Sequence, residues 1–371
     1  MQQIWIRKHG GPEVLEVRNV PDPEPGPGQV RVRARAVGLN FAEVSARQGL
    51  YPDAPRPPCV VGYEGAGIVD AVGPSVTRWA VGDRVVFASR FGGHSEAVCV
   101  GEEQAFRMPD SMSFEDGAAM LVNYLTAYHM LFVVRRLQPS DTVLVHMAAG
   151  GVGTAVLQLC RTVEGVTTIG TASAKKHDYV RSQGADHVID YRTNDYVAEV
   201  KRLTNGRGVD VVLDALGGPD WRRGYSILSP GGLLVAFGLA NAAGSGKRSL
   251  VRALGQVVRQ PLFNCMTLMS DNRGVAGVNM GHLWDDVAFI GREAEALVKL
   301  YAQGKIKPHI GGVFPFSRVA EAHGELENAR NVGKIILLPD RYAAGRDLVG
   351  RGGNAGESNP PDAAVAAPRR F

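Results

Sequence analysis

The chain has 371 residues, of which 21% are charged, and its 41 Lys and Arg against 37 Asp and Glu give a formal net charge of +4. This length suits two domains with cores of their own, and so small a positive balance does not argue for a nucleic-acid partner. No apolar run approaches the roughly 20 residues of a membrane span, and the four cysteines form no C-x-x-C pair. We therefore expect a cytoplasmic protein with no signal segment, disulfide framework or structural zinc knot.

The chain up to about Met108 is predicted to form a small, turn-rich β barrel. Residues 4–37 have the pattern of short strands, interrupted by a proline-rich turn at 21–28. Within 29–37, Val and Ala alternate with three arginines, which is typical of a half-exposed strand. Glycine-punctuated strands continue through Gly62–Gly67 and Val81–Val85.

From Phe114 the hydrophobic period becomes helical, and strands then alternate with helices to about residue 240. The predicted strands are Val166–Thr171, His187–Asp190, Val209–Asp214 and Leu233–Gly238. This alternation indicates an α/β domain with a doubly wound parallel sheet.

The remaining C-terminal part is less regular. Lys247–Leu262 is predicted to be a basic amphipathic helix and Arg273–Met280 a strand. As the last strand of an open sheet, 273–280 would be an exposed edge, which often pairs across a two-fold axis, so we expect a homodimer. A helix at 291–303 and a strand near 333–338 follow, and residues 341–371, rich in Ala, Gly, Arg and Pro, are predicted to be disordered.

The most informative segment is Thr142–Gly153, in which a β-rich run leads into the turn Gly150-Gly151-Val152-Gly153. Thr154–Val163 is then predicted to be a helix. Glycines let the backbone approach a pyrophosphate, and the N-terminus of the helix offers it unpaired N–H groups. A dinucleotide site is therefore predicted, although a glycine-rich loop in any α/β fold has a similar pattern.

The next strand indicates which dinucleotide binds. An NAD site carries Asp or Glu about 20 residues past the glycines, to bond the ribose 2′-hydroxyl. Here the sequence is Thr171-Ala172-Ser173-Ala174-Lys175-Lys176, with no acid before Asp178. Hydroxyl and ammonium groups attract a 2′-phosphate, so we expect NADPH; the alternative is that the two lysines only begin a solvated helix.

Taken together, these motifs resemble the medium-chain dehydrogenase/reductase superfamily in its zinc-free quinone oxidoreductase branch, over residues 1 to about 340. The residues that carry the resemblance are Gly38–Glu43, Arg47–Tyr51, Gly62–Gly67, Ala148–Gly153 and Asn331–Lys334. Within the branch the chain is most similar to synaptic vesicle membrane protein homologues of the vesicle amine transport type, through Leu121–Tyr128, Leu144–Gly151, Leu159–Val163, Gly170–His177 and Ile306–Ile310. The resemblance implies a GroES-like catalytic barrel (1–124 and 286–340) and a Rossmann domain that binds NADPH (125–285), ahead of a tail at 341–371.

The resemblance also implies a reaction without metal. Zinc-dependent relatives have Cys where Asn40 stands and His where Tyr63 stands, together with a lobe of four closely spaced cysteines. This sequence has neither, and its nine histidines show no ligand spacing. His146, at the end of a strand, is expected to be a near-core group rather than a ligand.

For catalysis, the resemblance places Asn40 and Thr126 at the nicotinamide pocket, with Thr126 at the start of the helix that joins the domains. Tyr51, on a loop over the cleft, is expected to steer the substrate or donate a proton. Each has a structural alternative: Asn40 could hold a loop backbone, Thr126 could cap a helix and Tyr51 could pack at the rim. Glu64 is expected to brace its own turn rather than act as a base.

For the cofactor, the resemblance places Ser173, Lys176 and Tyr191 around the 2′-phosphate, with Lys175 as a neighbouring candidate. Gly238 and Leu239 are expected to bring backbone groups to the carboxamide, and Asn331 to reach the cofactor from the C-terminal segment. Asp214, at the end of its strand, could belong to the site or only cap the strand.

Two functions follow from these residues. The first is an NADPH-dependent reductase of a small-molecule substrate, either a quinone or an activated carbon–carbon double bond such as an enone or enoyl thioester. The second is an NADPH-binding protein with little turnover that acts through a partner or a membrane, for which the basic helix at 247–262 is the candidate surface. We favour the enzyme, because all three cleft residues are present and a solvated helix is the commoner explanation of 247–262.

Overall fold

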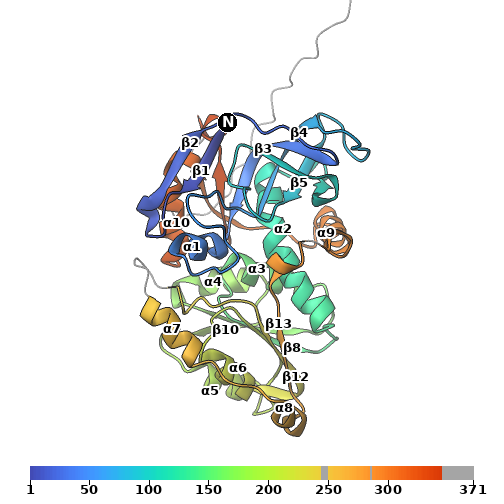
Figure 1. The fold of residues 1–371 in the computed structure, drawn as a ribbon. Helices are drawn as coiled ribbons and strands as arrows, with labels where there is room; N and C mark the ends of the chain where they lie inside the picture. Colours follow the sequence, from blue (N-terminus) through green and yellow to red (C-terminus); the bar gives the residue numbers. More distant parts are fainter. Residues whose placement is uncertain (244–249, 285, 345–371) are drawn as a thin grey trace, which may run out of the picture.

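The computed structural model describes residues 1–243, 250–284 and 286–344, which form two domains that lie one above the other in Figure 1. Both ends of the described chain belong to the upper domain, and the middle of the chain builds the lower one. Helix α2 (Phe114–Tyr128) runs between them and continues into a wider π-helical turn, His129–Val134.

The upper domain, called here the barrel domain, is built mainly of antiparallel strands. Its main sheet has the order β14-β15-β3-β4-β5-β7, with β6 also paired to β3, and β1 and β2 form a separate hairpin. Along β3 the small apolar side chains face the core while the arginines face outward, as the alternation predicts. The strands are β1 (Gln2–Ile6), β2 (Leu15–Asn19), β3 (Gln29–Leu39), β4 (Glu64–Val72), β5 (Arg84–Ala88), β6 (Ala97–Gly101), β7 (Ala105–Arg107), β14 (Ile310–Pro315) and β15 (Lys334–Leu338).

The lower domain, called here the parallel-sheet domain, contains the predicted doubly wound sheet. Its strands pair in parallel in the order β10-β9-β8-β11-β12-β13, so the direction of winding reverses between β8 and β11. Ligands of such sheets bind beyond the carboxyl ends of the strands at this reversal. The strands are β8 (Thr142–Val145), β9 (Thr167–Ala172), β10 (His187–Asp190), β11 (Val209–Asp214), β12 (Leu228–Ala236) and β13 (Gly274–Gly277).

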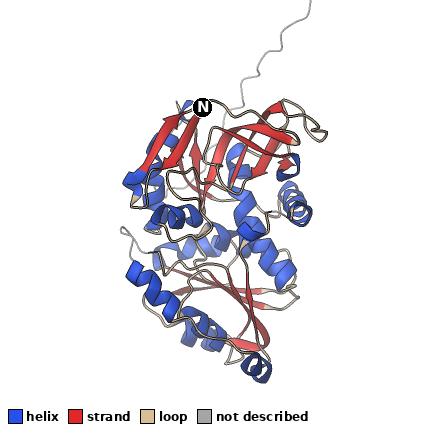
Figure 2. Cartoon of the chain, in the orientation of Figure 1, coloured by secondary structure: helices blue, strands red, loops and turns tan. Residues whose placement is uncertain are grey.

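Helices pack around both sheets (Figure 2). Besides α2 they are α1 (Phe41–Gln48), α3 (Gly151–Cys160), α4 (His177–Ser182), α5 (Tyr196–Leu203), α6 (Asp220–Ser226), α7 (Leu250–Val258), α8 (Cys265–Asp271), α9 (Val287–Ala302), α10 (Val319–Glu327) and α11 (Asp340–Ala343).

Helix α2 is the main packing element between the domains. It lies against β3, β4 and β5 of the barrel and against α3 and α9. With the π-helical turn it forms a stretch, Phe114–Val134, that is long and apolar enough to cross a membrane, which the sequence analysis did not anticipate. Most of this stretch is buried inside the protein, as expected for a core helix.

The structure corrects several predicted boundaries. Helix α1 lies where only strands were expected. The sequence did contain a signal for this helix: Asn40 and Glu43, three residues apart, form a capping box at its N-terminus. Helix α3 begins at Gly151, not Thr154, because the glycine turn itself forms the first helical turn, and it ends at Cys160. Strand β12 begins at Leu228, five residues before its predicted start.

Further differences concern the C-terminal third. Of the basic helix predicted at 247–262, the structure describes α7 over Leu250–Val258, and residues 247–249 lie outside the described residues. Strand β13 covers only part of 273–280. Residues 341–344, predicted to begin a disordered tail, are ordered: Arg341 pairs with Glu96 and Ala343 is buried, whereas 345–371 lie outside the described residues.

Candidate functional site

The glycine turn lies at the reversal point of the parallel sheet, between the end of β8 and the start of α3. A Cβ added at Gly153 would lie 2.6 Å from backbone atoms of Met147 and Ala148, and one added at Gly151 would lie 2.0 Å from Nδ2 of Asn123. A side chain at Gly153 would therefore force the backbone to move, whereas one at Gly151 would displace the Asn123 side chain. The first-turn N–H groups of α3 have no partner within the helix, so Gly150–Gly153 fits a pyrophosphate cradle.

A segment from the barrel domain lies across this turn. The N–H of Gly333 donates to the carbonyl of Ala149 at 2.8 Å, and Asn331 Nδ2 donates to the carbonyl of Gly333 at 2.9 Å. Lys176 Nζ donates to the carbonyls of Ala329 and Asn331, at 2.8 and 2.5 Å. The segment 329–333 is thus bound to the parallel-sheet domain at both ends, and Asn331 stands beside the glycine turn.

The predicted 2′-phosphate residues gather at the carboxyl ends of β9 and β10. Ser173 precedes a short 3-10 turn, Ala174–Lys176, and Tyr191 follows β10 directly. Lys175 is exposed, but Lys176 is half-buried, and this burial lowers the pKa of its ammonium, with the charge of Arg192 acting in the same direction. Lys176 is therefore not a solvated helix start.

Arg192 belongs to this group although the sequence analysis did not single it out. Its guanidinium lies 6.0 Å from the centre of the Tyr191 ring, and it is close enough to Lys176 to influence the titration of that lysine. The sequence did contain a signal for Arg192, because this cation directly follows Tyr191, which was already assigned to the site.

At the ends of β11 and β12, Gly238 and Leu239 lie against the loop after Asp214. A Cβ on Gly238 would lie 2.8 Å from the carbonyl of Ala215, and Leu239 is 42% exposed. Asp214 Oδ1 accepts from the N–H groups of Leu216 and Gly217, at 2.6 and 2.9 Å, so this carboxylate caps the end of its strand. Its other oxygen lies 4.0 Å from His146, a buried ring that contacts the Thr171 hydroxyl at 3.1 Å.

A buried polar cluster occupies the barrel side of the domain boundary. The ammonium of Lys334 donates hydrogen bonds to Glu64 and to Asn40 Oδ1. Asn40 Nδ2 in turn donates to Glu64 at 3.1 Å and to Glu43 at 3.3 Å. The second oxygen of Glu64 accepts from the N–H of Val122 in α2 at 2.7 Å. Glu64 thus braces β4, β15 and α2, and the Asn40 amide is hydrogen-bonded to three ionisable side chains.

This cluster has two carboxyl groups and one ammonium in surroundings that exclude water. Burial raises the pKa of Glu43 to about 8, although the charge of Lys334 opposes the rise. His94, also fully buried, contacts the carbonyl of Gly38 at 3.3 Å, and burial lowers its pKa to about 4. Glu64 and Lys334 form an ion pair, and the raised pKa of Glu43 favours its neutral acid.

Tyr51 stands at the boundary itself. Its hydroxyl faces the parallel-sheet domain, where a Cβ added at Gly281 would lie 3.1 Å from it. Two residues on, Asp53 pairs with His282 at 2.8 Å, so the Tyr51 loop contacts the other domain through a second link. The Tyr51 ring meets that of Tyr63 edge to face, with centroids 6.4 Å apart.

Thr126 lies near the end of α2 rather than at its start, which corrects the expected position. Its hydroxyl donates to the carbonyl of Val122, one turn earlier, at 2.8 Å, and the residue is almost buried. This bond is internal to the helix, so Thr126 does not act as a helix cap.

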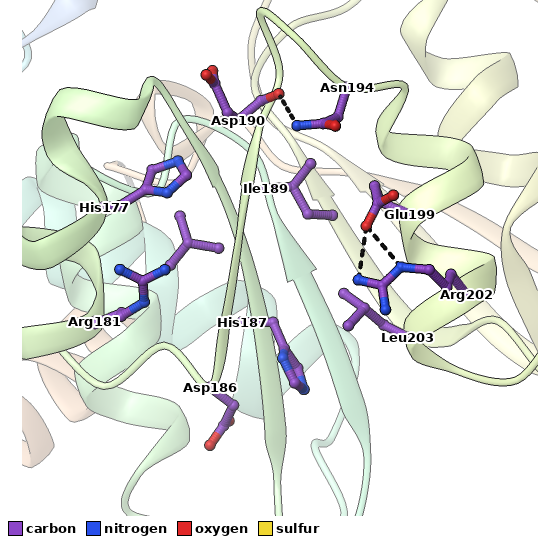
Figure 3. A pocket seen from close by; sticks show the side chains of 11 residues that line it. His177, Arg181, Asp186, His187, Ile189, Asp190, Asn194, Glu199, Arg202 and Leu203 are labelled. Carbon is purple, nitrogen blue, oxygen red and sulfur yellow. Dashed lines mark hydrogen bonds and ion pairs between the residues drawn. The ribbon is translucent and has the colours of Figure 1, made fainter.

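A separate shallow pocket of about 240 Å³ lies beside β10, between α4 and α5 (Figure 3). Its lining is largely charged and includes His177, Arg181 and an Arg202–Glu199 pair. None of the predicted site residues lines it. Over residues 1–243, 250–284 and 286–344, no group of three or more His, Cys, Asp or Glu is placed to hold a metal ion.

Comparisons with known proteins agree with this arrangement. The alcohol dehydrogenase GroES-like domain family matches residues 26–135, and the zinc-binding dehydrogenase family matches residues 183–337. The human synaptic vesicle membrane protein VAT-1 homolog is 47% identical over 304 residues, 82% of this chain and 77% of that protein. A quinone oxidoreductase of Pseudomonas aeruginosa is 38% identical over 91% of this chain and 99% of its own length.

Among solved structures, Escherichia coli quinone oxidoreductase complexed with NADPH superposes with a TM-score of 0.81 at 32% identity. The match covers 91% of this chain and 100% of that one.

Replacing Lys176 with Glu should weaken NADPH binding at least tenfold more than NADH binding, a difference of about 1.4 kcal/mol, because the new carboxylate would repel a 2′-phosphate. Dissociation constants for both coenzymes from calorimetry would measure this. Lys175→Glu is the matched control, since Lys175 is the exposed neighbour, and its effect should be smaller. Equal losses for NADPH and NADH would contradict the 2′-phosphate role.

The Glu43→Gln variant should alter how stability depends on pH. Burial raises the pKa of Glu43 from 4.5 to about 8, so the stability gained by holding its proton is present below pH 4.5 and is lost as pH rises to 8. Relative to Glu43→Gln, which imitates the neutral acid, the wild type should lose up to about 1.4 kcal/mol of unfolding free energy per pH unit in this window. Urea unfolding at several pH values tests this, and parallel curves for the two proteins would show that Glu43 is ionised throughout.

Proposed function

The chain belongs to the quinone oxidoreductase-like medium-chain dehydrogenase/reductase superfamily, and on this premise we propose that it is a zinc-independent, NADPH-dependent reductase. Its substrate is proposed to be a quinone or an activated carbon–carbon double bond, such as an enone or enoyl thioester. The observation that carries this proposal is the half-buried Lys176, which bonds the segment that lies across the glycine turn and stands where an NAD site has an acid.

In this proposal the pyrophosphate binds Gly150, Gly151, Val152 and Gly153, and the 2′-phosphate binds Ser173, Lys176, Tyr191 and Arg192. Gly238 and Leu239 contact the carboxamide, and Asn331 borders the pyrophosphate from the barrel side. When bound, NADPH supplies a hydride for the conjugated carbon of the substrate. The two domains hold the reactants between them and exclude water from the contact.

The proposal needs no Lewis acid. In zinc-dependent relatives the metal is held by Cys and His at the positions of Asn40 and Tyr63, which are poorer zinc ligands here. Beside them, the ammonium of Lys334 forms an ion pair with Glu64 and donates a hydrogen bond to the oxygen of Asn40. Asn40 is therefore proposed to hold one side of the substrate site in place. Thr126 is proposed to line the same side of that site.

The remaining requirement is a proton. After hydride addition a quinone or enone carries negative charge on oxygen, and the Tyr51 hydroxyl at the domain boundary is the proposed donor. Burial raises the pKa of Tyr51, so the hydroxyl keeps its proton at neutral pH until a basic oxygen lies beside it.

We further propose a cytoplasmic homodimer that pairs through β13. This strand is the last in the described parallel sheet and is bonded on one side to β12. The helix before it, α8, exposes Met266 and Met269, at 68% and 66% of their surface. A second copy would cover both the strand edge and these side chains.

The alternative function, membrane association with little turnover, is favoured by one observation on α7. Val251, Leu254 and Val258 share a helix face and are 84%, 64% and 75% exposed. No acidic residue occurs from 221 to 270, whereas Arg252 and Arg259 belong to this helix and its end. Such a surface suits an anionic bilayer.

The enzyme proposal predicts NADPH oxidation with at least one acceptor among benzoquinone, phenanthrenequinone, octenone and crotonyl-CoA. NADH should be a poorer donor at equal concentration, and prior treatment with a strong chelator should leave the rate unchanged, because no step uses a metal. Absorbance of the reduced nicotinamide gives the rates. Tight NADPH binding without turnover of any acceptor would favour the alternative function.

The two exposed surfaces should respond separately to matched charge substitutions. Met266→Glu with Met269→Glu should convert the dimer into a monomer, as measured by light scattering, without changing vesicle binding. Val251→Glu with Leu254→Glu should leave the mass unchanged and remove any co-sedimentation with anionic vesicles. Wild-type protein that is monomeric, or that never sediments with vesicles, would reject the corresponding interaction.

A further inference from the structure

Tyr63 is buried, and the fold provides no hydrogen-bond partner for its hydroxyl among the described residues. The side chain is 5% exposed, and its hydroxyl has no hydrogen-bond partner of normal geometry among the described residues. Leaving such a group without a partner costs about 1–3 kcal/mol, and a phenylalanine would avoid that cost. The ring itself is well packed, against Phe91 at 5.5 Å and Tyr51 at 6.4 Å between centroids.

The Tyr63 side chain lies between the barrel core and the domain boundary, where Tyr51 is its neighbour. Tyr51 lies on the boundary side, with its own hydroxyl against Gly281 of the parallel-sheet domain. The Glu43 carboxyl, when ionised, raises the pKa of both tyrosines, and Asp53 acts in the same direction. The positive charge of Arg90 lowers the pKa of the Tyr51 hydroxyl. The nearby Tyr63 hydroxyl lowers that pKa as well.

We propose that Tyr63 is a positioning residue for Tyr51, to whose oxygen its buried hydroxyl donates a hydrogen bond during proton transfer. The inference rests on the proposed function, in which Tyr51 protonates the reduced substrate.

Addition of hydride to the conjugated carbon would leave the electron pair of the broken double bond on the substrate oxygen. The O–H bond of Tyr51 breaks, its proton forms a new O–H bond on that oxygen, and its electron pair stays on Tyr51 as a phenolate. The O–H of Tyr63 remains intact and stabilises this phenolate, which would otherwise develop beside the carboxyl groups of Glu43 and Asp53. A water molecule then returns a proton to Tyr51.

The decisive experiment is a double-mutant cycle with Tyr63→Phe and Tyr51→Phe, since phenylalanine keeps the ring packing and removes only the hydroxyl. Tyr51→Phe should lower kcat about 100-fold, and Tyr63→Phe about tenfold with KM for NADPH unchanged. The double variant should match Tyr51→Phe alone, because Tyr63 acts only through Tyr51. Tyr225→Phe, whose hydroxyl bonds Asp271 at the far side of the parallel-sheet domain, should behave as wild type.

A second readout requires no turnover. NMR of tyrosine labelled with carbon-13 at the hydroxyl-bearing carbon, with the Tyr51 signal assigned from Tyr51→Phe, follows the titration of Tyr51 in the coenzyme-free protein. Tyr63→Phe should raise the pKa of Tyr51, because a donor to the phenolate is lost. Additive kinetic effects, or an unmoved Tyr51 titration, would overturn the inference. A wild type that reduces no acceptor would instead reject the proposed function, and the titration would still decide whether the two tyrosines are coupled.

Discussion

The structure depends on how the charge of one buried ammonium is satisfied. Lys334 stands at the start of β15 and is almost fully enclosed, so its charge must be balanced by groups that are themselves fixed. Glu64 and Asn40 supply that balance, and Glu64 also receives the N–H of Val122 from α2. One ionic centre therefore determines where β4, β15, α1 and α2 meet.

The neighbouring residue extends this constraint into the other domain. Gly333, directly before Lys334, donates its N–H to Ala149 in the glycine turn. The position of the ammonium in the barrel thus helps to fix the segment that lies across the glycine turn. At the domain boundary, a buried polar cluster on the barrel side meets the reversal point of the parallel sheet, and the Tyr51 hydroxyl lies against Gly281 of the parallel-sheet domain.

Much of this arrangement could be predicted from the sequence because its signals are local. Alternation in β3, the apolar runs of the parallel strands and the glycine turn each depend on a few adjacent residues. Helix α1 had a local signal too, in its capping pair, but strand patterns on both sides obscured it. The carbonyl partners of Lys176 and the proximity of Tyr63 to Tyr51 had no local signal, because they join residues far apart in the chain.

The two carbonyls that hold Lys176 have a consequence for the entropy of coenzyme binding. A free lysine side chain loses up to about 2 kcal/mol of rotational freedom when it is immobilised. Here that loss accompanies folding, since two of the three ammonium N–H bonds are already directed to Ala329 and Asn331. In the proposed NADPH site, the 2′-phosphate would therefore meet a side chain whose third N–H needs little further ordering. An arginine at the same position would present a planar array of donors in place of the three directions of an ammonium.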